Sequence, residues 1–265
     1  MNGLRLIADD LTGALDSGCA FAKPEATVVI AVPGRALPKS ARIAISTESR
    51  DMSETDAAAA VSRAVRDLSV ADPETLWFKK IDSVMRGHPF AETVAALEAG
   101  EFAHCIFAPA YPGMGRITLK MQQYLTNRTP PPQPVGPDFR DAFQSLKHGW
   151  RVAPPDGRTP DSKATGVITI IEADSQPLLR QRVQSALSAA AGKMLWVGTG
   201  GLAAALTPER APARFPPVRG VIVGTNHDST RQQIAAALSE AVFTELTDTM
   251  PIGRATGVLM TRHRP

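Results

Sequence analysis

Short apolar runs recur along the chain and predict the strands of a sheet. These runs are LRLIA (4–8), TVVIAV (27–32), RIAIS (42–46), LWF (76–78), CIFA (105–108), VITII (167–171), MLWV (194–197) and GVIVG (220–224). Between many of them, apolar residues recur at helical spacing, as at Val61, Val65 and Leu68 or at Leu179, Val183 and Leu187. Strands that alternate with helices predict an α/β protein with a parallel-rich sheet and helices on both faces.

Two stretches interrupt this alternation. Residues 126–163 are rich in Pro, Gly and Asp and are interpreted as an irregular excursion or a mobile flap, with simple disorder as the alternative. Residues 207–220, TPERAPARFPPVRG, have the composition of an interdomain linker. The predicted organisation is a domain over 1–206, a Pro-rich linker over 207–219 and part of a second α/β domain over 220–265.

The composition is that of an ordinary soluble globular protein. Of the 265 residues, 43% are hydrophobic and 21% are charged. This length suits one large domain, or one domain with a smaller unit. The formal net charge is only +3 and the basic residues are scattered, so we expect no nucleic-acid partner, whereas a small anionic ligand fits.

We expect neither a targeting signal nor a metal motif from this sequence. Cys19 and Cys105 lie far apart, without the C-x-x-C spacing of a zinc site and without a disulfide framework, so a reducing cytoplasm is the simplest location. The start MNGLRLIADD reaches two aspartates before a signal-type apolar segment develops, and no run approaches the ~18 apolar residues of a membrane span. We therefore expect a cytoplasmic protein with no membrane partner and no metal held by the chain itself.

Charged side chains follow several predicted strands at their carboxyl ends. Ligands of parallel sheets bind beyond these ends, so polar residues there are candidate binding groups. They are Asp9 and Asp10 after LRLIA, Arg50 after RIAIS, Lys79, Lys80, Asp82, Ser83 and Arg86 after LWF, and Arg116 in a Pro/Gly loop after CIFA.

The adjacent carboxylates Asp9 and Asp10 leave two interpretations open. Paired carboxylates at a strand end bind a metal, orient a hydroxyl or act as a base. Alternatively, an aspartate and Thr12 merely cap a helix that carries Leu15 and Cys19 inward. A haloacid-dehalogenase-type phosphatase also begins with aspartates at a strand end, but it needs D-x-D spacing, which disfavours that class.

Each cation by itself is more often solvated surface than part of a site. Four loops that deliver Arg, Lys or Asp to one edge of a sheet favour a site instead. Arg recognises carboxylate or phosphate with two parallel hydrogen bonds, and Lys supplies a point charge. Together with carboxylates that bind hydroxyl groups, these cations predict a pocket for a small polyhydroxy acid.

Five blocks of the sequence, in order, resemble signature segments of the four-carbon acid sugar kinase family, whose members phosphorylate tetronate-type acids with ATP. Three blocks are ADDLTGALDSG (8–18), KKIDSVMRG (79–87) and APAYPGMGR (108–116). VGTGGLAAAL (197–206) is similar to the segment that closes the family's substrate-binding domain, and VIVGTNHDSTRQQI (221–234) to the opening of its nucleotide-binding domain. The similarity is collinear over most of the chain.

The resemblance implies which residues form the site. The sugar acid would be bound by Asp9, Asp10, Arg50, Lys80, Asp82, Arg86 and Arg116. The phosphate donor would be ATP with Mg2+; Asp82 is the first candidate for the catalytic base and Asp10 the second. The nucleotide would be approached by Gly224, Thr225, His227 and Thr230, since a glycine turn that feeds a helix offers N–H groups to phosphate. The alternative is an ordinary strand-to-helix turn capped by Ser229 or Thr230, with a solvated His227.

Two segments depart from the family pattern. Family members continue for well over a hundred residues beyond the 221–234 block, with a glycine-rich nucleotide loop there, whereas this chain ends at VLMTRHRP. We therefore expect some ATP contacts to be absent, replaced or supplied by another subunit. After Arg116 the chain reads ITLKMQQYLTN, where family members carry a glycine-containing T-v-x-G continuation.

ATP-dependent phosphorylation of a four-carbon sugar acid, impaired by a C-terminal truncation, is thus the first functional hypothesis. The second is a catalytically inactive sugar-acid-binding remnant, or a subunit that needs a separate nucleotide-binding partner. A phosphatase that uses Asp9 and Asp10 is the third, disfavoured by their spacing. Self-association is also expected, because an incomplete second domain would leave apolar surface uncovered.

Overall fold

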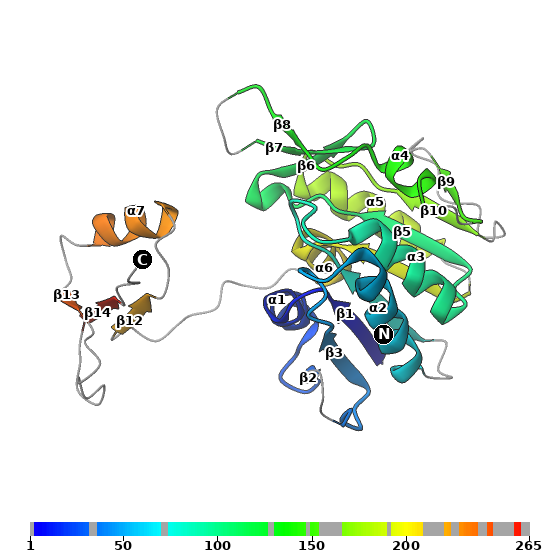
Figure 1. Ribbon diagram of the computed structural model, residues 1–265, viewed down its shortest axis with the longest axis horizontal. Coiled ribbons are helices and arrows are strands. Elements are labelled where there is room, and N and C mark those ends of the chain that lie inside the picture. The colour runs from blue at the N-terminus through cyan, green and yellow to red at the C-terminus, as the bar shows by residue number, and fades with distance from the viewer. Residues whose placement is uncertain are drawn as a thin grey trace. The chain divides into compact units, whose positions relative to one another are not determined.

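A parallel sheet of eight strands runs through the first unit of the chain, Met1–Glu209 (Figure 1). In order across the sheet, its strands are β2 (Val29–Ala31), β3 (Arg42–Ser46), β1 (Gly3–Ala8), β4 (Thr75–Lys80), β11 (Met194–Gly198), β5 (His104–Ala108), β10 (Val167–Ile170) and β9 (Arg151–Ala153). Each strand pairs with its neighbours in parallel. The predicted α/β fold with a parallel-rich sheet is confirmed.

The structure, a computed structural model, describes residues 3–31, 36–69, 74–126, 130–146, 149–153, 166–189, 192–208, 220–223, 228–237, 243–245 and 257–260. The second unit, Arg210–Pro265, contains helix α7 (Asp228–Ala237) and a small parallel sheet in which β14 (Gly257–Met260) lies between β12 (Gly220–Val223) and β13 (Phe243–Glu245). Most of the predicted linker at 207–219 lies outside the described residues.

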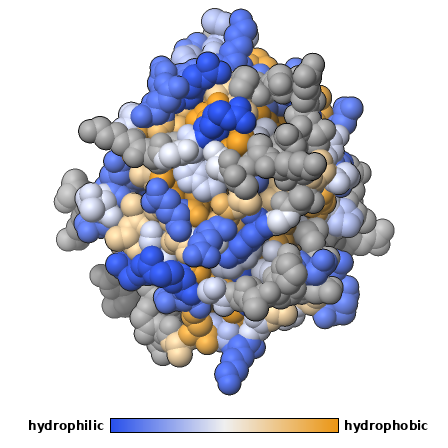
Figure 2. Space-filling view, turned by 90° about the vertical axis from the view of Figure 1, so that its right-hand side faces the viewer, coloured by the Kyte–Doolittle hydropathy of each residue, from blue (hydrophilic) through white to orange (hydrophobic). Residues whose placement is uncertain are grey.

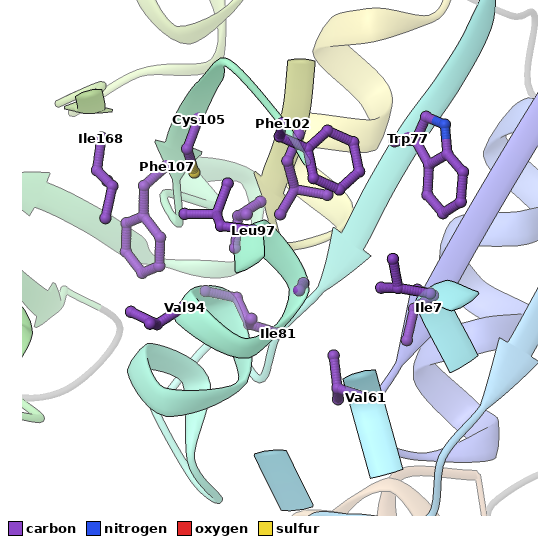
Figure 3. Packing of buried hydrophobic residues seen from close by; sticks show 14 of the residues in the cluster. Ile7, Val61, Trp77, Ile81, Val94, Leu97, Phe102, Cys105, Phe107 and Ile168 are labelled. Atoms are coloured by element: carbon purple, nitrogen blue, oxygen red, sulfur yellow. The ribbon is translucent and has the colours of Figure 1, made fainter. Parts of the chain in front are cut away.

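Helices cover both faces of the large sheet and enclose two apolar cores. One face packs against α2 (Glu54–Asp67), α3 (Pro89–Gly100) and α4 (Phe139–Gln144), and the other against α1 (Leu11–Phe21), α5 (Gln176–Ser188) and α6 (Gly200–Leu206). Successive strand residues point to opposite faces. In β4, Trp77 therefore joins the first core, shown in Figure 3, while Leu76 and Phe78 join the second.

Local signals explain where several helices begin. Ser53 caps α2, since its hydroxyl accepts a hydrogen bond from the Asp56 N–H, and Asp138 caps α4 in the same way through two N–H groups. Pro89 occupies the first position of α3, where its missing N–H costs nothing. Helices α2 and α3 thus begin directly after the loops that carry Arg50 and Arg86.

Helix α1 corrects the prediction that Leu15 and Cys19 point inward. Leu15 is 51% exposed and Cys19 is exposed, whereas Ala14 and Phe21 are buried. The inward face also carries Gly13, Ser17 and Gly18, because the helix lies close to the sheet: a Cβ added at Gly18 would approach Ile30 Cδ1 to 3.3 Å. The size and hydrophobicity of its side chains therefore do not identify the buried face of α1.

The predicted irregular excursion at 126–163 is more ordered than expected in its described part. Within it, β8 (Gln133–Val135) completes a three-stranded antiparallel sheet with β6 (Arg116–Leu119) and β7 (Gln122–Leu125), which precede the excursion. Helix α4 buries Phe139 and Phe143 completely, and β9 joins the edge of the large sheet. The Pro-rich composition did not indicate this structure. Helix α4 is short, and the two phenylalanines that it buries are few among the surrounding Pro, Gly and Asp residues. Residues 154–165 lie outside the described part.

Polar and apolar residues share the face of the molecule that Figure 2 shows. On the face in Figure 2, hydrophilic residues predominate among those described, with hydrophobic residues between them. Large exposed apolar side chains include Leu11, Leu15, Met114 and Leu119. No helix within the described residues is both long enough and apolar enough to cross a bilayer.

Candidate functional site

The carboxyl ends of three adjacent strands bring most of the predicted site residues together. Strand β1 lies between β3 and β4, with Ala8 paired in register to Ser46 on one side and Lys80 on the other. The loops that follow these strands therefore start side by side. They carry Asp9, Asp10, Arg50, Asp82 and Arg86.

Arg50 lies at the centre of this cluster. Its guanidinium donates to both oxygens of Asp9, with Nε 2.8 Å from Oδ2 and Nη2 3.0 Å from Oδ1. Its Nη1 donates to Asp10 Oδ2 at 2.5 Å, and Nη2 is 3.7 Å from Asp82 Oδ2. Burial lowers the pKa of Arg50, but the hydrogen bond and charge of Asp9 and the charges of Asp10 and Asp82 outweigh it, so the pKa is raised.

The turn from Asp82 to Arg86 forms the second part of the cluster. Asp82 Oδ2 accepts from Arg86 Nη2 at 2.6 Å and Nε at 3.1 Å, and Oδ1 accepts from the N–H groups of Val84 and Arg86. Burial raises the pKa of Asp82, yet these hydrogen bonds outweigh burial and hold its pKa below the ordinary value of 3.8. Asp82 is thus an anchored carboxylate, while the Arg86 side chain remains 63% exposed.

The Asp82–Arg86 turn contacts the loop that carries Arg50 at Gly87, the residue that follows the turn. Gly87 has φ +72°, and a Cβ added there would lie 3.3 Å from both the Arg50 Cα and its carbonyl oxygen. Only glycine combines this left-handed conformation with so close an approach. Gly87 therefore allows Arg50 and Arg86 to share one edge of the sheet.

Lys80 is buried beside Asp10. Its Nζ donates to the Ile81 carbonyl at 3.0 Å, and the residue is 7% exposed. Burial lowers the pKa of Lys80, against the opposing charges of Asp9, Asp16, Asp10 and Asp82. A Cβ added at Gly13 would lie 2.7 Å from Asp10 Oδ1 and 3.3 Å from Lys80 Nζ, so both groups border the same small space.

Lys79 does not belong to the ligand edge. It is fully buried, and its Nζ pairs with Glu92 Oε2 of α3 at 2.6 Å. The other Glu92 oxygen accepts from Ser49 Oγ at 2.6 Å, and Ser49 N–H donates to the Asp9 carbonyl at 2.9 Å. This buried network supports the loop that carries Arg50, and no pattern in the sequence predicts it.

Arg116 is the predicted residue that the structure places outside the carboxylate cluster. It begins β6, after the turn Pro112–Met114, and its Nη1 donates to the Met114 carbonyl. Its charge acts on Tyr111, whose pKa is raised first by burial and then by Asp16, against the effect of Arg116. A Cβ added at Gly200 would lie 2.9 Å from Asp16 Oδ2 and 2.8 Å from Tyr111 Cε1.

Asp16 and Tyr111 are therefore site neighbours that sequence reasoning missed. Both lie inside the quoted blocks ADDLTGALDSG and APAYPGMGR, which was the available signal. The charge of Asp16 acts on both Lys80 and Tyr111. These two residues extend the candidate site from the carboxylate cluster toward Arg116.

The predicted nucleotide residues are only partly described. Helix α7 begins at Asp228, as expected from the sequence, and Thr230 lies half-buried in its first turn. Gly224, Thr225 and His227 lie outside the described residues. Within the described part of the chain, no three His, Cys, Asp or Glu side chains are arranged to hold a metal ion.

A parallel α/β sheet whose strand-end loops gather carboxylates and cations defines the class of small-molecule-binding α/β proteins. Residues 4–138 match the family described as the sugar-binding N-terminal domain. The chain is 31% identical over 255 residues to D-threonate kinase of Bordetella bronchiseptica, which covers 89% of this chain and 62% of the relative. It is 29% identical over 261 residues to D-threonate kinase of Salmonella typhimurium, covering 88% of this chain and 60% of the relative.

A solved structure agrees with these relatives. A protein of a domain-of-unknown-function family from Bordetella bronchiseptica, crystallised with bound citrate as a domain-swapped dimer, superposes with a TM-score of 0.59 and is 26% identical. The match covers 92% of this chain and 66% of that protein. The chain belongs to the four-carbon acid sugar kinase family. It spans 60 to 62% of the length of the two D-threonate kinases.

Proposed function

We propose that the protein takes part in the ATP-dependent phosphorylation of a four-carbon sugar acid of the tetronate type. The observation that carries the proposal is the cluster of Arg50, Asp9, Asp10, Asp82 and Arg86 at the carboxyl ends of adjacent parallel strands. The D-threonate kinases among its relatives and the citrate bound to a related protein support a small acid as the ligand. Carbohydrate metabolism in the cytoplasm is the setting that this activity implies.

Arg86 is assigned as the main residue that binds the carboxylate of the sugar acid. Arg86 is 63% exposed and is held in place by Asp82, so its outer edge is accessible to a ligand. Arg50 is 17% exposed and already bound to Asp9 and Asp10, which suits it better to organising those carboxylates. Arg116 and Lys80 are the further cations that border the site.

Asp10 is assigned as the base that orients the substrate hydroxyl to which the phosphoryl group is transferred. Both candidates from the sequence, Asp82 and Asp10, lie in the cluster, but the Asp82 side chain is 7% exposed and that of Asp10 is 24% exposed. The lowered pKa of Asp82 also makes it a weaker proton acceptor. Asp10, which also caps α1 because its Oδ1 accepts from the Gly13 N–H at 2.6 Å, then orients the hydroxyl, and Asp82 holds Arg86.

ATP would supply the phosphoryl group, and Mg2+ would accompany it. The donor is assigned to the second unit by family resemblance alone, around Gly224, Thr225, His227 and Thr230. A separate nucleotide-binding subunit is the alternative source. The domain-swapped dimer of the related protein supports self-association of this chain, which sedimentation would test.

Calorimetric titration tests the binding half of the proposal. Wild-type protein is titrated with D-threonate and D-erythronate, and then with Mg-ADP in the presence and absence of the acid. Heat from both ligands supports the kinase, and heat from the acid alone favours a sugar-acid-binding protein that needs a nucleotide-binding partner. If neither D-threonate nor D-erythronate produces heat, the substrate assignment is overturned.

Phosphoryl transfer from Mg-ATP tests the catalytic half. Asp10→Asn should abolish transfer and leave acid binding within a few-fold, because the amide keeps the shape but accepts no proton. Asp82→Asn should weaken acid binding by releasing Arg86. The opposite pattern, with transfer lost in Asp82→Asn and retained in Asp10→Asn, would return the role of base to Asp82.

A further inference from the structure

Gln123 is a fully buried amide in β7 whose hydrogen bonds reach three other segments. Its Oε1 accepts from Thr118 Oγ1 of β6 at 2.7 Å. Its Nε2 donates to two main-chain carbonyls, those of Ser83 and Pro109, each at 3.2 Å. Both the Gln123 and Thr118 residues are 0% exposed, so water does not replace these bonds.

The two carbonyls belong to the two loops that border the candidate site. Ser83 directly follows Asp82 in the turn that presents Arg86. Pro109 directly follows β5, in the loop that leads to Tyr111 and Arg116. One side chain therefore ties the Asp82–Arg86 turn to the loop on the Arg116 side.

A second contact presses the antiparallel sheet against the same turn. A Cβ added at Gly136, just after β8, would lie 2.8 Å from both Cβ and Cγ of Met85. Met85 has φ +62° and Gly136 has φ +70°. A non-glycine residue in the left-handed region persists only where the surroundings hold it, and here the sheet supplies the surroundings.

The antiparallel sheet is itself anchored to the loop that follows β10 of the large sheet. Thr118 and Ala173 exchange both main-chain hydrogen bonds, at 2.9 and 3.1 Å. The Met121 N–H donates to Glu172 Oε1 at 2.6 Å. The sheet of β6, β7 and β8 is thus a fixed wall, and Gln123 is the side chain by which it holds the two loops.

We propose that Gln123 is a positioning residue that sets the Asp82–Arg86 turn relative to the Tyr111–Arg116 loop. Its Nε2 has two hydrogens, and each goes to one loop, so the amide holds both loops at a fixed separation. Loss of the amide leaves two carbonyls and the Thr118 hydroxyl without their buried partner, and the turn is freed to move.

Hydrogen exchange tests this role without any ligand. The Val84 and Arg86 N–H groups donate to Asp82 Oδ1 at 2.9 and 3.2 Å, and therefore report on the turn. In Gln123→Ala these two amides should exchange about tenfold faster, as expected for the loss of roughly one hydrogen bond's protection. The amides of α5 should keep their rates.

The matched control is Gln184→Ala. Gln184 Nε2 donates to the Ala205 carbonyl at 2.9 Å, between α5 and α6, so this variant also loses an amide-to-carbonyl bond but away from the site. Unchanged exchange at Val84 and Arg86 in Gln123→Ala, or equal acceleration in both variants, would overturn the proposal. Should Gln123→Ala fail to fold, Thr118→Val removes only the hydroxyl that holds the amide oxygen, and the same two amides are compared.

A second measurement, which rests on the proposed function, determines the affinity of the variants for D-threonate. Below the unfolding transition, Gln123→Ala should bind D-threonate about tenfold more weakly than wild type, whereas Gln184→Ala should match wild type. Unchanged affinity with accelerated exchange would confine the role to the turn and overturn the link to binding. If wild type binds no tetronate, the proposed function fails while the exchange result still decides the role of Gln123.

Discussion

Arg50 holds Asp9 through two parallel hydrogen bonds, from Nε to Oδ2 at 2.8 Å and from Nη2 to Oδ1 at 3.0 Å. The arginine follows β3 and the aspartate follows β1, so this fork joins two neighbouring strand ends. The third nitrogen of the guanidinium reaches Asp10. Arg50 thereby neutralises part of the charge of two adjacent carboxylates and fixes the direction in which Asp10 faces the site.

Replacing Arg50 with lysine should weaken binding of the sugar acid by tenfold or more. A lysine keeps the charge but provides no planar fork, and hydrogen bonds to charged groups contribute about 1.5–3 kcal/mol each. Calorimetric titration with D-threonate measures the change. The exposed Arg63 of α2 provides the matched control, since Arg63→Lys should leave the affinity unchanged; equal affinities of both variants would contradict the role of the fork.

The stabilising effect of Asp82 should disappear in acid. Because hydrogen bonds hold its pKa below 3.8 in the folded protein, the unfolded chain binds the proton more readily, and Asp82 stabilises the fold above that value. The contribution is lost as the pH falls through the lowered folded pKa. The difference in free energy of unfolding between wild type and Asp82→Asn should thus be largest near neutral pH and narrow below about pH 4.

Denaturant titrations at pH 7, 5, 4 and 3 measure this difference. Asp67→Asn, at an exposed carboxylate at the end of α2, controls for the substitution itself. A wild-type advantage over Asp82→Asn that stays constant from pH 7 to pH 3 would show that the ion pair with Arg86 does not contribute.

The β6–β7 hairpin should become more stable when Lys120 is replaced with glycine. Leu119 pairs with Gln122, and the two residues between them, Lys120 and Met121, have φ +50° and +63°. Positive φ at both positions is the type I′ pattern, which favours Asn and Gly. A residue with a Cβ costs about 1–2 kcal/mol of folding free energy in this conformation. Glycine removes that cost, but the greater backbone entropy that it loses on folding offsets ~0.5–1 kcal/mol of the gain.

Lys120→Gly should therefore raise the free energy of unfolding by about 0.5–1 kcal/mol. Lys120→Ala is the matched control, because it removes the charge and keeps the Cβ. Equal stability of the two variants in denaturant titrations would show that the backbone conformation at this position carries no strain.

The strand ends were predictable because apolar runs and their flanking charges follow simple rules. RIAIS at 42–46 matches β3 residue for residue, and the rule that parallel strands end at one edge predicts that Asp9, Arg50 and Asp82 lie close together. The prediction needed only the order of residues along each strand and the direction of the sheet.

Other features depend on which element packs against which, and no local pattern contains that information. The position of Lys79 directly after LWF predicts a place beside its charged neighbours, yet Lys79 points to the same face as Trp77 and pairs with Glu92 of α3. Helix α1 buries glycine and alanine, because it lies too close to the sheet for its leucines. Tertiary packing decided both outcomes.

Breaking the Lys79–Glu92 pair should destabilise the fold strongly. The two groups are 2.6 Å apart with side chains 0% and 1% exposed, so either charge left alone is buried without its counter-charge, which costs about 3–5 kcal/mol. Lys79→Met and Glu92→Leu should each lower the free energy of unfolding by this amount. The double variant should lose much less than the sum, because no unpaired charge remains.

The double variant also separates stability from support of the site. Glu92 accepts from Ser49 Oγ at 2.6 Å, and the neighbouring Arg50 depends on that loop. The double variant should therefore recover stability in denaturant titrations and still bind D-threonate more weakly than wild type, since the Ser49 loop has lost its hydrogen bond to α3. Ser49→Ala, which removes the same bond together with the hydroxyl contact to Thr47 and leaves the ion pair intact, should reproduce the weaker binding with a small loss of stability. Full affinity in both variants would limit the pair to a role in the core.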